Sequence, residues 1–183
     1  PSGVPAGDMT AEMVAGMPVA GPYGSWHGPA KPSSEWRFHL DIMRVRPEVG
    51  AVVHTHAPHA TALAIARRSI PACHYMIAAF GGSDVRCAGY ARFGTAALST
   101  LALAALEDRS ACLLANHGMI ATGSDLDDAV WRARELETLA RHYCLSLAIG
   151  EPVLLSDAQV EEARAAFAGY GRSGTKAGCD AED

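Results

Sequence analysis

The sequence predicts a single α/β domain, and three observations support this. Short apolar runs at 49–54 and 111–115 are typical of buried strands, whereas 33–47 and 125–149 carry apolar residues at helical spacing. A chain of 183 residues with 49% hydrophobic and 19% charged residues can bury a core and is not disordered. No internal repeat or linker divides it, so the mixture of helices and strands favours one α/β domain.

The N-terminal half is expected to hold a loop, two helices and two strands. Trp36, Leu40 and Met43 are spaced by four and three residues, which indicates one helix, and Pro58 suits the first turn of the next. Valine-rich residues predict the first strand, and Gly81-Gly82 ends the second. The expected elements in order are a loop at 1–32, a helix at 33–47, a strand at 49–54, a helix at 58–67 and a strand at 74–79.

The C-terminal half is expected to be mainly helical around a pair of strands. Asn116-His117-Gly118 predicts a tight turn between these strands, and apolar residues spaced by three or four predict one long helix. Ser156 and Gln159 form a capping box for the last helix. The expected elements are a helix at 95–107, strands at 111–115 and 119–122, a helix at 125–149, a helix from 156 to 167 and a flexible tail at 173–183.

Charge and cysteine content exclude several classes of protein. The formal net charge is −5 without a basic run, which argues against a nucleic-acid partner. The uncharged stretches 13–30 and 49–66 are broken by Pro or His, so we expect no membrane span. Five cysteines without a CxxC spacing favour reduced thiols and a cytoplasmic location. Because the chain starts at Pro1 without Met, we expect a preceding segment to be missing from it.

His54 and His56 form an HxH pair on a predicted strand. Residues i and i+2 of a strand point to the same face, so both imidazoles project together. Neutral imidazole is a common zinc ligand, and a catalytic zinc usually takes three protein ligands and keeps a fourth position open. The pair therefore indicates a metal site, although two histidines at the end of a strand can also be purely structural.

His117 and Glu35 are the candidates for further ligands. His117 ends an apolar strand and is followed by Gly118, which allows the backbone to approach closely. Glu35 lies in the first turn of a predicted helix, where an acidic side chain can also simply complement the helix dipole. Ser33 and Ser34 precede the same helix, and their hydroxyls are suited either to N-capping or to binding phosphate.

The chain resembles the class II aldolase/adducin family, and within it most closely the aldolases that act on L-fuculose 1-phosphate. The resemblance runs from Ser2-Gly3 to Tyr170-Gly171, with separated motifs in the family's order and spacing. It implies a three-layer α-β-α fold with a central mixed, largely antiparallel sheet, and one domain over 1–172. The matching runs are Pro32 to His39, Val53 to His56, Ile70 to Ala79 and Asn116 to Ile120.

The resemblance also implies the metal centre. His54, His56 and His117 match the family's zinc-binding histidines, and Mn²⁺ or Co²⁺ are alternatives to Zn²⁺. Glu35 matches the acidic residue that lies at the metal and acts as acid and base. A non-catalytic, adducin-like interaction domain would not need these four residues, so their presence favours an enzyme.

The substrate contacts follow from the same resemblance. The positions that match the phosphate-binding residues are Ser2, Gly3, Ser33 and Ser34. Tyr75 matches a tyrosine that reaches the active site of a neighbouring subunit and protonates the leaving oxygen. Phe93 matches an aromatic wall of the aldehyde pocket, and Tyr170 matches a tyrosine of the C-terminal tail that covers the site.

The expected function is that of a lyase in carbohydrate metabolism. The resemblance implies cleavage of L-fuculose 1-phosphate, or of a 5-deoxy- or 5-methylthio-pentulose 1-phosphate, to dihydroxyacetone phosphate and an aldehyde. A methylthioribulose-1-phosphate dehydratase or a pentulose-phosphate 4-epimerase shares the metal arrangement and remains an alternative. The expected partners are a sugar phosphate and three further copies of the chain, in a homotetramer with active sites at the subunit interfaces.

Overall fold

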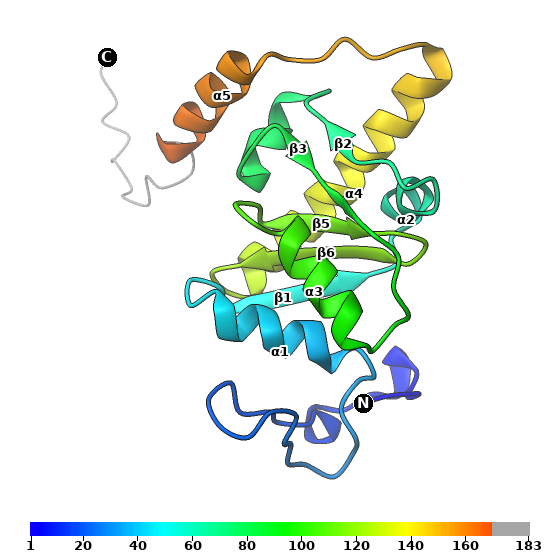
Figure 1. The fold of residues 1–183 in the computed structure, drawn as a ribbon, viewed down its shortest axis with the longest axis vertical. Helices are drawn as coiled ribbons and strands as arrows, with labels where there is room; N and C mark the ends of the chain where they lie inside the picture. Colours follow the sequence, from blue (N-terminus) through cyan, green and yellow to red (C-terminus); the bar gives the residue numbers. More distant parts are fainter. Residues whose placement is uncertain (170–183) are drawn as a thin grey trace, which may run out of the picture.

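The computed structural model describes residues 1–169, and a four-stranded sheet lies at its centre (Figure 1). The strand order is β1-β6-β5-β4, in which β4 and β5 are parallel and the other neighbours antiparallel. The prediction of a mixed, largely antiparallel sheet is thereby confirmed. The strands are β1 (Ala51–Thr55), β4 (Cys87–Ala88), β5 (Ala111–Leu114) and β6 (Gly118–Gly123).

Strand register brings the end of β1 beside the turn of the β5–β6 hairpin. Leu114 pairs with Gly118 at the turn, and Thr55 pairs with Met119 one residue further along β6. The residues that follow β1 therefore lie next to the residues that join β5 to β6. This register decides where the functional side chains meet.

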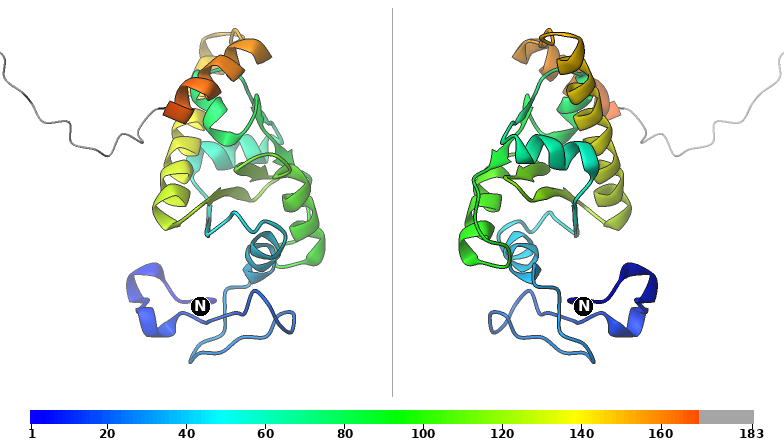
Figure 2. Two further views of the ribbon diagram at one scale, coloured as in Figure 1. Left: turned by 90° about the vertical axis from the view of Figure 1, so that its left-hand side faces the viewer. Right: turned by 90° about the vertical axis from the view of Figure 1, so that its right-hand side faces the viewer.

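Helices cover both faces of the sheet, as the side views show (Figure 2). The strands alternate their side chains between the two faces, so Leu113 packs in one hydrophobic core and Leu114 in the other. The three-layer α-β-α expectation is confirmed. One face carries α1 (Trp36–Val45) and α3 (Ala96–Ala105), and the other carries α2 (Pro58–Ile65) and α4 (Leu126–Ile149).

The long helix and the last helix begin as the sequence predicts. The carboxylate of Asp125 accepts a hydrogen bond from the Asp128 amide at 2.8 Å and so caps α4. Ser156 and Gln159 form the reciprocal capping box of α5 (Asp157–Gly169), with distances of 2.9 and 3.3 Å. The predicted tail at 173–183 lies outside the described residues. Within residues 1–169, no helix is long and apolar enough to cross a membrane.

The strand expected at 74–79 is wrong, because this segment is the 3-10 helix η3 (Tyr75–Phe80). The His74 ring accepts a hydrogen bond from the Met76 amide, and Gly81 with φ 95° ends the helix. Ile77 and Phe80 are three residues apart, so one turn of the 3-10 helix places both on the same side, where both are buried. A short apolar run does not distinguish a strand from a buried helical segment by its pattern alone.

Several short features were not predicted from the sequence, among them the two-residue strand β4. A small antiparallel ribbon of β2 (Ile70–Pro71) and β3 (Asp84–Val85) flanks η3, and α5 packs against η3. The N-terminal region is mainly loop, as expected, with η1 (Ala6–Asp8), η2 (Ala11–Met13) and one isolated bridge between Gly16 and His27. This region lies beside α1 at the opposite end of the molecule from α5 (Figure 1).

Candidate metal centre and active site

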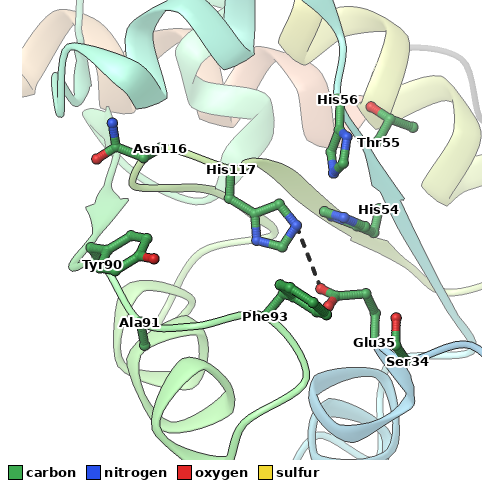
Figure 3. Close-up of a pocket in the computed structure, with 10 residues that line it drawn as sticks. All are labelled: Ser34, Glu35, His54, Thr55, His56, Tyr90, Ala91, Phe93, Asn116 and His117. Carbon is green, nitrogen blue, oxygen red and sulfur yellow. Dashed lines mark ion pairs between the residues drawn. The ribbon is translucent and has the colours of Figure 1, made fainter.

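Three histidines converge where β1 ends beside the β5–β6 turn (Figure 3). His54 is on β1, His56 follows the strand, and His117 lies in the turn. Each offers one ring nitrogen, and these three atoms lie within 4.8 Å of one another. The ring centroids are 4.9 to 5.1 Å apart. The structure therefore brings together the three residues that the sequence predicted as ligands.

Backbone geometry at the hairpin turn makes this convergence possible. Asn116 adopts a left-handed conformation with φ 55°, which a short polar side chain tolerates. Gly118 lies so close to β1 that a Cβ atom there would be 2.5 Å from the Thr55 carbonyl oxygen and 2.7 Å from Cδ2 of His56. The expectation that Gly118 permits a close backbone approach is thereby confirmed.

The surroundings of His54 prepare its ring for a metal. Its Nδ1 lies 2.9 Å from the Met119 carbonyl oxygen, which can only accept a hydrogen bond, so Nδ1 carries the proton and Nε2 keeps its lone pair. Burial lowers the pKa of His54 to about 4. Burial, with a smaller contribution from His56, also lowers the pKa of His117. Both rings are therefore neutral, as a metal ligand must be, at neutral pH.

Glu35 directs a buried carboxylate toward the histidines. It lies immediately before α1, and its Oε2 is 3.6 Å from Nε2 of His117. The side chain is 12% exposed, and among residues 1–169 neither carboxylate oxygen has a hydrogen-bond partner. Burial raises the pKa of this carboxyl, although the His56 ring opposes the shift. A buried carboxylate without a partner is costly and fits a site that receives a cation.

A cavity of about 580 Å³ opens in front of this cluster. Of the residues predicted for substrate or metal, Ser34, Glu35, Phe93 and the three histidines line it. The sequence analysis missed the other lining residues, because no spacing rule marks them. Only the position of Asn116 directly before His117 offered a signal. The missed residues are Thr55, Tyr90, Ala91 and Asn116.

The four predicted phosphate positions lie close together but not in one pocket. Ser33 lines an adjacent hollow with Pro1, and its hydroxyl accepts a hydrogen bond from the Glu35 amide at 3.2 Å. Ser2 lies beside the segment that leads to Ser33, because its amide donates a hydrogen bond to the Lys31 carbonyl at 3.3 Å. The conformation of Gly3, with φ 78°, is left-handed.

The three aromatic residues predicted to contact the substrate differ in where they lie. Phe93 lines the cavity and is 62% exposed. Tyr75 is also exposed, but it stacks on Phe167 at 6.0 Å and lines a separate hollow between η3, α4 and α5. The fold of one chain therefore does not bring Tyr75 to the histidines. Tyr170 lies outside the described residues.

Comparison with known proteins decides the family. The model of the class II aldolase and adducin N-terminal domain matches residues 1–144. The chain belongs to the class II aldolase and adducin family. This confirms the family indicated by the sequence motifs, and the histidine cluster suits the divalent metal expected for such a protein.

Similar members of the class II aldolase and adducin family are named as aldolases. The 5-methylthioribulose-1-phosphate/5-deoxyribulose-1-phosphate aldolase of Rhodospirillum rubrum is 53% identical over 93% of this chain and 76% of its own length. The L-fuculose phosphate aldolase of Escherichia coli K12 is 51% identical over 76% of this chain and 66% of its own length. The predicted enzyme class, a lyase of the aldolase type, agrees with these relatives.

A solved structure supports the same assignment at the level of the fold. An L-fuculose 1-phosphate aldolase superposes with a TM-score of 0.87 at 40% identity and covers 92% of this chain and 78% of its own. The chain thus spans about two thirds to about three quarters of the length of these relatives.

Proposed function

We propose that this protein is a metal-dependent aldolase that cleaves a ketose 1-phosphate to dihydroxyacetone phosphate and an aldehyde. One observation carries the proposal: three histidine nitrogens within 4.8 Å of one another lie beside the buried carboxylate of Glu35, which has no hydrogen-bond partner within residues 1–169. The cavity in front of them, about 580 Å³, is large enough for a small sugar phosphate.

The donor set favours zinc as the bound ion. Three neutral imidazoles and one carboxylate are ligands that Zn²⁺ prefers, and Mn²⁺ or Co²⁺ are the alternatives. His54, His56 and His117 would hold the ion, with Glu35 beside it. When bound, a divalent cation supplies Lewis-acid stabilisation of the negative charge that develops on the ketone fragment, an effect on the order of several kcal/mol.

Glu35 is assigned the proton transfer to carbon. Cleavage of the carbon–carbon bond removes a proton from the substrate hydroxyl and requires another at the carbon of the ketone fragment. The raised pKa of Glu35 brings its proton exchange nearer to neutral pH, where a general acid or base is most effective. Tyr75 of a neighbouring subunit is assigned to the oxygen at the aldehyde end.

The phosphate group is assigned to the segment before α1. Ser34 lines the cavity, and Ser33 lies next to it with Ser2 and Gly3 nearby. Hydroxyl groups and free backbone amides at a helix N-terminus bind phosphate well. Because these residues are remote from the bond that breaks, their binding energy orients the substrate for the reaction.

The aldehyde end of the substrate is assigned to aromatic side chains. Phe93 lines the cavity, and Tyr75 and Tyr170 complete the pocket in this proposal. Aromatic walls suit a deoxy, methyl-bearing or thioether-bearing end as well as a hydroxylated one. The names of the relatives point to the same range of substrates: L-fuculose phosphate, 5-deoxyribulose 1-phosphate and 5-methylthioribulose 1-phosphate.

The working form is proposed to be a homotetramer in the cytoplasm. Tyr75 lies away from the histidines of its own chain and is 53% exposed, which suits a residue that acts in a neighbouring subunit. The four described cysteines, Cys73, Cys87, Cys112 and Cys144, are all free, as in a reducing compartment.

The decisive experiment is a product assay with metal-loaded protein. Each of the three ketose 1-phosphates is incubated with the protein, and dihydroxyacetone phosphate is measured by a coupled reduction. We expect its formation from at least one substrate and its absence with His56→Ala, which should lose metal and activity together. Loss of substrate without triose phosphate would instead assign the protein to the dehydratases or epimerases.

A further inference from the structure

Helix α2 begins two residues after the metal ligand His56, and its first turn lacks a local cap. The N-cap residue Ala57 offers no side-chain hydrogen bond, and Pro58 occupies the first turn. The early backbone amides of a helix have no partner within the helix and need one from elsewhere. The group that accepts hydrogen bonds from these amides therefore helps to fix the path of the backbone that follows His56.

Glu137, in the middle of α4, supplies this partner. Its Oε1 accepts hydrogen bonds from the His59 amide at 2.9 Å and from Nδ1 of His59 at 2.7 Å, and its Oε2 accepts from the Ala60 amide at 2.9 Å. Hydrogen bonds to an ionised carboxylate are stronger than neutral ones, and a negative charge is favourable at a helix N-terminus. A residue 77 positions away from Ala60 thus caps α2.

The charge state of Glu137 agrees with this role. Burial alone would raise the pKa of its carboxyl, but the hydrogen bonds from Ala60 and His59 outweigh burial and lower the pKa below its usual value. The side chain is 25% exposed and does not line the cavity of the histidines. All of its hydrogen bonds go to the start of α2, which is the route by which its carboxylate can act on that cavity.

The other end of α2 is tied to the second half of the cluster. The Asn116 amide donates to the Ala64 carbonyl at 3.0 Å, and the Asn116 side-chain oxygen accepts from Nε of Arg67 at 3.0 Å. Asn116 directly precedes His117. Helix α2 consequently connects the segment that follows His56 to the residue that precedes His117.

The position of His56 depends on helix α2 more than the position of His54 does. The ring of His54 is held by the Met119 carbonyl and its backbone by β1. His56 lies past the last residue of β1 and is exposed, and within residues 1–169 its ring makes no hydrogen bond. Besides the close approach of Gly118 to its ring, the chain on either side sets its position, and on one side this is the start of α2.

We propose that Glu137 is a positioning residue of the metal centre: by capping α2, it holds His56 within reach of the other two histidines. The inference rests on the proposed function in one respect, since it takes the histidine cluster to bind a divalent cation. It predicts that loss of the carboxylate weakens metal binding although Glu137 touches neither metal nor substrate.

The test compares the affinity for Zn²⁺ of full-length wild type and Glu137→Gln in a competition titration with a chromophoric chelator. Side chains that hydrogen-bond directly to metal ligands typically contribute about 10- to 100-fold in affinity. Because Glu137 acts through α2 and not on a ligand directly, we expect Glu137→Gln to weaken binding at the low end of this range, by about tenfold. The absorption spectrum of the Co²⁺-loaded variant should also change, because a displaced His56 alters the ligand geometry. His59→Ala keeps the two backbone hydrogen bonds to Glu137 and should weaken binding less.

Asp125→Ala is the control, because it removes the side-chain cap at the start of the same helix α4, at a position that makes no hydrogen bond to α2. It should lower the melting temperature of the metal-free protein but leave the Zn²⁺ affinity within about twofold of wild type. An affinity of Glu137→Gln equal to wild type, or reduced no more than in the control, overturns the proposal.

The outcome also separates this inference from the proposed function. A wild-type protein that binds metal but forms no dihydroxyacetone phosphate overturns the aldolase reaction and leaves the Glu137 comparison valid. A wild-type protein that takes up no divalent metal overturns both. A Co²⁺ spectrum of Glu137→Gln identical to wild type argues against displacement of His56 and overturns the positioning role.

Discussion

Glu35 has two properties that suit the proton transfer proposed for it. Its carboxylate lies 3.6 Å from Nε2 of His117, and neither of its oxygens has a hydrogen-bond partner within residues 1–169. Burial raises its pKa, so the group can take up and release a proton closer to neutral pH than an ordinary glutamate.

Glu35→Gln should therefore separate metal binding from turnover. The amide keeps the shape of the side chain, and the three histidines remain, so most of the bound metal should be retained. Removal of a general acid or base typically lowers kcat by about 10²- to 10⁴-fold. Metal content by elemental analysis and kcat for the best ketose 1-phosphate test this, and a fully active variant would exclude Glu35 as the proton carrier.

His39 shows how burial of a titratable residue affects stability instead of chemistry. It is on α1, and burial lowers its pKa to about 4, below the ordinary value of 6.5. The unfolded chain then binds the proton more readily than the folded chain, so stability is complete above pH 6.5 and declines as the pH falls toward 4. The facing titratable group is His54, whose pKa His39 also helps to lower.

Between pH 7.5 and pH 5, His39 should cost the metal-free protein about 2 kcal/mol of unfolding free energy. His39→Leu removes this titration, so its stability should depend less on pH by that amount. Urea unfolding of chelator-treated wild type and variant at both pH values measures the difference. Parallel pH dependences would show that His39 is not neutral and buried in the folded state.

At the scale of elements, the β5–β6 hairpin and β1 bring the three histidines together through a close contact at Gly118. Only a residue without a side chain fits there, because a Cβ would lie 2.5 Å from the Thr55 carbonyl oxygen and 2.7 Å from His56. The first of these neighbours is backbone and cannot move without disturbing the pairing of β1 with β6.

Gly118→Ala should destabilise the protein by about 1 to 3 kcal/mol, the usual cost of overpacking. It should also weaken metal binding, because the added methyl group displaces His56. Gly7→Ala is the control, since a Cβ at Gly7 meets no atom within 4 Å. Thermal unfolding and a Zn²⁺ titration of both variants check this, and a Gly118→Ala protein with unchanged affinity would contradict the contact.

The elements that the sequence predicted well are those with long or strongly marked patterns. The 24 residues of α4 show helical spacing throughout, and its Asp125 cap and the Ser156 capping box are local signals. The segment 74–79 has neither advantage. It is too short for periodicity to decide, and the hydrogen bond of the Met76 amide to the His74 ring makes it helical.

At the scale of the whole molecule, the proposed tetramer predicts that subunits share active sites. The variants Tyr75→Phe and Glu35→Gln should each be nearly inactive. If Tyr75 acts in a neighbour's site, a mixed oligomer contains some sites with an intact Glu35 from one chain and an intact Tyr75 from the next. Dissociation and reassociation of an equal mixture should therefore restore part of the activity.

The mixture of Glu35→Gln with His56→Ala is the control for subunit sharing. These residues belong to the same site of one chain, since both line the same cavity, so no mixed site can be intact. Size-exclusion chromatography confirms that the mixtures reassemble. Complementation in neither mixture, with reassembly demonstrated, would place Tyr75 outside the neighbouring active site.

The sequence by itself determined the local features: the α/β character, the helices α1 to α5, the strands β1, β5 and β6, and the pair of His54 and His56 at the end of a strand. Each follows from periodicity or capping within a few residues. Only the tertiary structure decided that Asn116 lines the cavity and that Glu137 caps the helix after His56. Such contacts join residues far apart in the chain, and packing of the layers, not local pattern, brings them together.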